Sequence, residues 1–289
     1  MGGGSFSEET YTHTRALRSA SGIPDFEYTQ TATKIYDTLD PMRILSKPYK
    51  MLESRDSVEH PISTPLIMSF DVTGSNYNNA KVAQQKLPDL MAKLTAVCEN
   101  PQVAIWANDD AYYVGRNAIQ LGEFESDNRI DDTIRNIWLT GKGGGNTGES
   151  YELILYAAAR KTITDSYEKR HKKGYLCMYA DEPFFDKVAA THIQEIFGDN
   201  AQADIPIADI VAEVQQKWLV YLIWPQNGQH RARNQYVELF GESNVITLQA
   251  PEHLCDQVAS IVAVNEMALA AVGVAATANM DEEFTARVE

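Results

Sequence analysis

The stretch Pro65-Leu66-Ile67-Met68-Ser69-Phe70-Asp71-Val72-Thr73-Gly74-Ser75 decides the fold of this chain. Its first part is an apolar run of the length that is typical of a buried strand. Behind that run, Asp71, Thr73 and Ser75 place one carboxylate and two hydroxyls at alternate positions in a turn. A strand that ends in such a turn can bring oxygen atoms together around one hard divalent cation. The stretch therefore predicts a buried strand with a metal site at its end.

Strand-like runs alternate with helical patterns along the rest of the chain, which is the signature of a parallel α/β sheet. Between the runs, apolar residues recur at helical spacing, and Pro88 should kink or restart the first helix. The second and third runs are joined by a polar loop without a helix, which indicates a hairpin. We expect a central, mostly parallel six-stranded sheet with one antiparallel edge strand and helices on both faces. The six runs are residues 66–71, 103–108, 119–124, 175–181, 219–224 and 245–248.

The flanking segments divide the chain into three parts. Residues 1–62 have little periodicity and predict an extended N-terminal arm that lies against the domain. Residues 63–275 form the domain, and residues 276–289 form a C-terminal tail. The weakly polar residues 258–278 are interrupted by Asn265 and Glu266, so they predict a packed helix and no membrane span.

Composition limits the partners and the compartment. Forty acidic and 25 basic residues give a net charge of −15, which repels phosphate backbones and anionic lipids. We therefore expect no nucleic acid and no membrane as partner. Three separated cysteines lie in apolar stretches, and no secretory signal is evident at the N-terminus, so the protein is expected to be cytoplasmic.

Two further polar positions belong with the first motif. Thr147 lies in the glycine-rich stretch 143–150, just before a predicted helix, and Asp181 follows the fourth strand. Ligand sites of doubly wound sheets form beyond the carboxyl ends of neighbouring strands. We therefore expect Thr147 and Asp181 to face the same crevice as Asp71.

The order of Asp-x-Thr-x-Ser, a threonine after a glycine-rich loop and an aspartate after the fourth strand resembles the von Willebrand factor A domain. The likeness covers roughly residues 63 to 272 and implies a Rossmann-like von Willebrand A fold with a metal-ion-dependent adhesion site. It implies direct metal coordination by the hydroxyls of Thr73 and Ser75, with Thr147 joining when ligand is bound. Asp71 and Asp181 would hold the ion through waters. Thr73 stands where serine is commoner and keeps the hydroxyl, whereas Asn76 and Glu182 could alter the metal preference.

The resemblance implies a binding function without catalysis. Mg²⁺, or Mn²⁺ or Ca²⁺, held largely by neutral hydroxyls keeps much of its charge, so an exposed Asp or Glu of a protein partner can complete its shell. A short leader stretch, residues 55–61, looks like a segment of bacterial and phage proteins of this type. Relatives of that kind often act beside AAA+ ATPases, which implies such an ATPase as a partner.

Other interpretations of the same residues remain open. Asp71, Thr73 and Ser75 are also common turn residues. The three glycines Gly143, Gly145 and Gly148 match the dinucleotide fingerprint, but a helical pattern precedes them where that fingerprint needs a strand. A nucleotide-binding or metal-assisted hydrolase using the same crevice is the enzymatic alternative, although no histidine falls in the three loops and Glu182 is the one spare base. A structural or assembly protein with a vestigial metal site is the third possibility.

Overall fold

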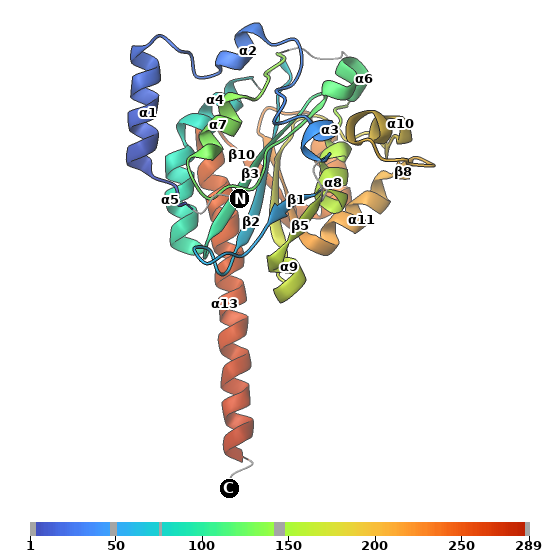
Figure 1. Cartoon of the computed structure of the whole chain (residues 1–289). Coiled ribbons are helices and arrows are strands. Elements are labelled where there is room, and N and C mark those ends of the chain that lie inside the picture. The colour runs from blue at the N-terminus through green and yellow to red at the C-terminus, as the bar shows by residue number, and fades with distance from the viewer. Residues whose placement is uncertain (1–3, 47–50, 75–76, 142–147, 287–289) are drawn as a thin grey trace.

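A six-stranded sheet forms the centre of the structure, a computed structural model that describes residues 4–46, 51–74, 77–141 and 148–286 (Figure 1). The strand order is β10-β9-β6-β2-β3-β4, and only the β3–β4 pair at one edge is antiparallel. The predicted α/β, Rossmann-like architecture with one antiparallel edge strand is therefore confirmed. The strands are β2 (Thr64–Asp71), β3 (Pro101–Asn108), β4 (Ile119–Leu121), β6 (Gly174–Tyr179), β9 (Trp218–Pro225) and β10 (Val245–Leu248).

The strand β2 lies between two hydrophobic cores, which explains why all eight of its residues are buried. Successive side chains of a strand point to opposite faces of the sheet. Leu66, Met68 and Phe70 accordingly belong to one core, and Ile67 belongs to the other. Burial on both faces accounts for the unbroken apolar run in the sequence.

Helices cover both faces of the sheet, as predicted. One face carries α4 (Tyr77–Gln85), α5 (Leu87–Val97), α7 (Arg129–Arg135) and the start of α13 (Leu254–Ala286). The other carries α8 (Tyr151–Arg160), α11 (Ile207–Lys217) and α12 (His230–Phe240). Pro88 lies in the first turn of α5, so the proline restarts the helix as expected.

The loop between β3 and β4 differs from the predicted plain hairpin. It contains α6 (Ala111–Val114) and η2 (Gly115–Asn117), and β4 ends at Leu121 instead of residue 124. At Gly122 the backbone that follows β4 comes very close to that of β3, and the Gly122 N–H donates to the carbonyl of Ile105 over 3.0 Å. A Cβ at Gly122 would meet that carbonyl oxygen at 2.6 Å, so only glycine fits at this position. The regular pairing of β3 with β4 ends just before it, at Leu121.

The expectation of an extended N-terminal arm is wrong. The arm contains α1 (Glu8–Ala20), α2 (Glu27–Thr31) and α3 (Pro41–Ile44), followed by β1 (Leu52–Ser54), which pairs with β5 (Thr162–Thr164). The side chain of Ser7 caps α1 by accepting a hydrogen bond from the Thr10 N–H, and Glu8 and Glu9 favour its positive end. These helix signals are stronger than the weak apolar periodicity of the segment.

The arm packs on the domain, as predicted. The Tyr11 hydroxyl donates to the carbonyl oxygen of Gln84 over 2.5 Å, and Arg18 forms a 2.7 Å ion pair with Asp131. Apolar residues of the arm are buried in the cores on both faces of the sheet. The boundaries after residues 62 and 275 stay predictions.

Helix α13 packs on the domain over its first part only, which corrects the prediction of a packed helix at residues 258–278. Val258 and Val262 are buried, whereas Val264, Met267 and Leu269 are exposed. The helix then extends away from the body of the molecule (Figure 1). The segment Pro251–Ala271 is long and apolar enough to cross a membrane, and it includes the residues that pack on the domain.

Short elements complete the described part of the chain. They are α9 (Asp165–Arg170), β7 (Lys187–Val188), α10 (Ala190–His192), η3 (Ile193–Phe197), β8 (Ile205–Pro206), η4 (Glu242–Asn244) and η5 (Pro251–His253). The strands β7 and β8 pair antiparallel outside the central sheet.

Candidate metal site

The chain order of the strands reverses between β2 and β6, and the candidate site lies at this point. The two strands are parallel neighbours, with Phe70 opposite Tyr179. Asp71 is the last residue of β2, and Asp181 follows the end of β6. Open α/β sheets bind ligands at the carboxyl ends of strands where the order reverses. The fold therefore brings both predicted aspartates to the position where such sheets form ligand sites.

The carboxylate of Asp71 is fully buried and held by three hydrogen bonds. Its Oδ1 accepts from the Thr73 N–H over 2.7 Å and from the Thr73 hydroxyl over 2.6 Å, and its Oδ2 accepts from the Tyr151 hydroxyl over 2.7 Å. Because the Thr73 hydroxyl donates its proton to the hydrogen bond with Asp71, the lone pairs of its oxygen remain available to a cation. This arrangement would leave the Thr73 oxygen able to contact a cation directly, with Asp71 bound to Thr73 behind it.

Tyr151, a buried residue at the start of α8, connects Asp71 with Asp181. Its hydroxyl oxygen lies 3.4 Å from Oδ1 of Asp181 and accepts a hydrogen bond from the Asp181 N–H over 3.3 Å. The single phenolic proton goes to Asp71, which is the nearer carboxylate. The Tyr151 hydroxyl thus links Asp71 with Asp181, and Thr73 is bonded to Asp71.

Two predicted ligands, Ser75 and Thr147, lie outside the described residues. The residues that follow Thr147 are described. Glu149 donates its N–H to the carbonyl of Pro183 over 3.0 Å, so the end of the glycine-rich stretch lies beside the loop that carries Asp181. Of the three glycines in the dinucleotide fingerprint, only Gly148 is described, and the segment before them forms the helix α7, as the sequence indicates.

Acidic groups at the site repel one another. Burial, and next the charge of Asp181, raise the pKa of Asp71 to about 7. Burial also raises the pKa of Glu149, followed by the charges of Asp71 and Asp110. Glu149 is buried, and its Oε2 has no hydrogen-bond partner among the described atoms. A bound cation would relieve this repulsion and stabilise the ionised carboxylates.

Sequence reasoning missed three residues of the site, namely Tyr151, Asp109 and Thr140. Besides Tyr151, the buried Asp109 accepts a hydrogen bond from the Thr140 hydroxyl, which lies 3.3 Å from the carbonyl oxygen of Val72. Asp109 follows β3, the strand next to β2, so its place after a strand end was the signal available. Tyr151 gave none, because its apolar ring fits the buried stripe of α8.

The donor set is compatible with a hard cation. Carboxylate and hydroxyl oxygens are the ligands that Mg²⁺ and Ca²⁺ prefer. Within the described ranges, no three Asp, Glu, His or Cys side chains form a complete cluster of the kind that holds an ion. The described residues therefore provide part of a coordination shell in which hydroxyls would have to contribute.

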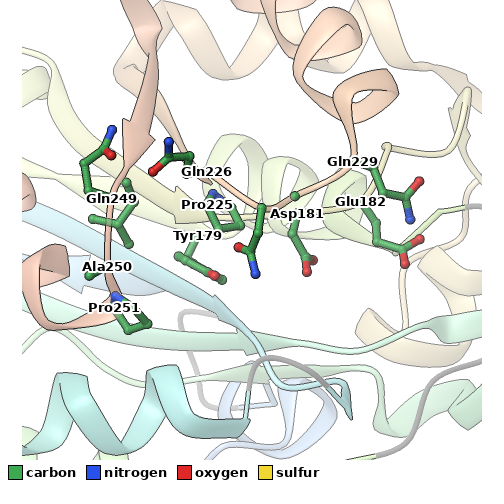
Figure 2. A pocket seen from close by; sticks show the side chains of 12 residues that line it. Tyr179, Asp181, Glu182, Pro225, Gln226, Gln229, Gln249, Ala250 and Pro251 are labelled. Atoms are coloured by element: carbon green, nitrogen blue, oxygen red, sulfur yellow. The ribbon is translucent and has the colours of Figure 1, made fainter.

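A pocket of about 610 Å³ adjoins the two acidic residues that follow β6. Figure 2 shows Asp181, Glu182 and Gln229 on one side of it, and Gln249, Ala250 and Pro251 on the other. Its lining comes from the ends of β6, β9 and β10: Tyr179, Asp181, Glu182, Pro225, Gln226, Asn227, Gly228, Gln229, Leu248, Gln249, Ala250 and Pro251.

A scan of family models and a search of curated proteins find no match to this chain. Among solved structures, the proximal thread matrix protein 1 of the mussel byssus is 13% identical, with a TM-score of 0.48, over 70% of this chain and 47% of that protein. The pilus adhesin SpaC of Lactobacillus rhamnosus GG is 8% identical, with a TM-score of 0.48, over 73% and 31%. A von Willebrand factor type A protein of Catenulispora acidiphila is 13% identical, with a TM-score of 0.42, over 70% and 42%.

This chain covers less than half the length of each of those three proteins. At such identities and scores they carry no functional argument. The fold class rests on the strand order of the sheet itself.

Proposed function

We propose that this chain is a divalent-metal-dependent protein-interaction domain. In this proposal Asp71, Thr73, Ser75, Thr147 and Asp181 hold Mg²⁺, or Mn²⁺ or Ca²⁺, and an Asp or Glu of a protein partner completes the coordination. The observation that carries it is the fully buried Asp71 carboxylate, to which the Thr73 hydroxyl donates over 2.6 Å at the point where the strand order reverses.

Two physical arguments support a cation at this place. A buried carboxylate beside other carboxylates is costly unless a positive charge compensates it, and the described hydrogen bonds to Asp71 come from neutral donors. In addition, a hydroxyl that donates to a carboxylate presents its lone pairs elsewhere, as a metal ligand must. Both arguments concern Asp71 and Thr73, the described part of the first motif.

The resemblance of the sequence implies an AAA+ ATPase as the partner in this proposal. The acidic ligand on the partner follows from the chemistry of an ion that keeps much of its positive charge.

The test is capture of partner proteins by the immobilised chain in Mg²⁺ or in EDTA. Thr73→Val removes the hydroxyl at nearly constant volume, whereas Thr73→Ser keeps it. We expect the same captured proteins with the native chain and Thr73→Ser in Mg²⁺, and their loss in EDTA or with Thr73→Val. Capture that persists in EDTA would show that the metal is not the contact.

A further inference from the structure

The pocket beside Asp181 has a side-chain chemistry that the proposed metal contact does not use. We call it the amide pocket, because four of its lining residues, Gln226, Asn227, Gln229 and Gln249, carry carboxamides. Asp181 and Glu182 add two carboxylates. Each carboxamide carries one acceptor oxygen and an NH2 group with two donors, and the Gln229 side chain is already hydrogen-bonded to Glu182, so the two carboxylates, which only accept, give the lining its preference for a donor with positive charge.

The same lining disfavours two common classes of ligand. None of the described lining residues is Lys, Arg or His, and two are acidic, so phosphates and other anions would be repelled. Sugars usually need an accessible aromatic face, but Tyr179, the one aromatic side chain among the lining residues that the structure describes, is only 4% exposed. A group with several N–H donors and a positive charge satisfies the acceptors best.

We infer that the amide pocket binds a lysine or arginine side chain that the protein partner presents close to its metal-bound acidic residue. The partner's part in this inference rests on the proposed function, whereas binding of the basic group itself requires no metal. The partner's recognition element is then an acidic residue with a basic neighbour.

The position of Asp181 supports pairing the two contacts. Asp181 belongs both to the predicted metal site and to the lining of the pocket, so an acidic and a basic group on one short segment can reach the two places. The net charge of −15 adds a long-range attraction for basic segments. Glu182 would instead repel a partner segment that carries several acidic residues.

The larger number of N–H donors favours arginine over lysine as the basic side chain. A guanidinium group offers five N–H donors in a plane, and Figure 2 shows the carboxylates of Asp181 and Glu182 on one side of the pocket and the carboxamide of Gln249 on the other. Glu182 is the half-buried carboxylate of the pocket that the predicted metal set does not include. Glu182→Gln therefore tests the pocket without altering a predicted metal ligand.

The experiment uses ethylguanidinium, which carries the head group of arginine and no carboxylate, in a titration of the full chain followed by NMR in EDTA. We expect saturable shifts of the side-chain amide signals of Gln226, Gln229 and Gln249. Glu182→Gln should weaken binding by about tenfold, as for loss of one hydrogen bond to a charged group. Glu238→Gln, the same change at an exposed position of α12 outside the pocket, should leave it unchanged.

Several results would overturn the inference. They are shifts that do not saturate, equal binding of the neutral probe N-methylacetamide, and an equal effect of the two glutamate substitutions. Gln249→Ala, at an exposed position, provides a second variant and should also weaken binding. Because the titration contains EDTA, its outcome is independent of metal-dependent capture, so the pocket and the proposed function can fail separately.

Discussion

The Tyr151 hydroxyl donates a 2.7 Å hydrogen bond to Oδ2 of Asp71 and lies 3.4 Å from Oδ1 of Asp181. One buried phenol is thereby bonded to the carboxylates at the ends of two neighbouring strands. The distance between these carboxylates depends on a helix, α8, that packs beneath the site on one face of the sheet.

Tyr151→Phe should weaken the binding of Mg²⁺ at pH 7 by about tenfold. The substitution removes the donor to Asp71, whose ionised form that hydrogen bond favours, at a cost of about 1–3 kcal/mol. Tyr156→Phe is the matched control, because the Tyr156 hydroxyl donates to Asp199 and not to the site. Calorimetric titration of both variants measures the difference. Equal Mg²⁺ affinities in the two would argue against a positioning role for Tyr151.

In the metal-free protein, the contribution of Asp71 to the free energy of unfolding should fall as the pH rises from 4 to 7. The pKa of Asp71 is raised from 3.8 to about 7, so in this window the folded state holds a proton that the unfolded state has released. Stability falls with pH wherever the folded state binds more protons, here by up to about 4 kcal/mol. Urea unfolding in EDTA at several pH values should show this decline in the native chain relative to Asp71→Asn. Identical pH dependence of the two would contradict the raised pKa.

Asp56→Asn should destabilise the protein by about 1–3 kcal/mol at neutral pH. Arg170 binds Asp56 with two nitrogens, at 2.7 and 3.1 Å, and holds the pKa of that carboxyl well below its usual range. A lowered pKa gives stability that is present above about pH 4 and is lost as the pH falls through the folded-state value. The difference in unfolding free energy should therefore shrink in acid. Asp89→Asn, which breaks an exposed pair with Lys86, is the control and should change little.

Two valines of α13 should respond differently to alanine. Val258 is fully buried, so Val258→Ala leaves a cavity and should cost about 2 kcal/mol. Val264 is 67% exposed, and Val264→Ala should be neutral or slightly stabilising, because alanine favours helices. Thermal unfolding of both variants tests whether the helix leaves the domain between these residues. A similar loss in both would mean that Val264 is covered in solution.

The sequence predicted the sheet well because burial on both faces leaves a clear record. The run at residues 65–70 and the other five strands are apolar and of strand length, which identifies them as strands, whereas their order in the sheet was not predicted because it depends on packing between distant segments. The helices of the arm were missed because α1 is mostly exposed and is specified by its Ser7 cap more than by periodicity. The exposure of Val264 and Met267 was missed because an apolar helix gives no sign of where its contacts end.

The candidate site was predictable only in part, for a related reason. Asp71 and Asp181 stand at strand ends, where local sequence indicates position, and their convergence follows from the sheet. Tyr151 joins them through an atom at the tip of a side chain that otherwise fits an apolar core. Contacts of this kind depend on packing between distant segments, which periodicity does not report.

The most direct test is calorimetric binding of Mg²⁺ to the native chain and to Asp71→Ala, with circular dichroism to verify that both are folded. We predict one saturable site in the native chain and its loss in the folded variant, because Asp71 orients Thr73 and supplies negative charge to the shell. A native chain without a saturable site, or a variant that binds Mg²⁺ as tightly as the native chain, would contradict the account.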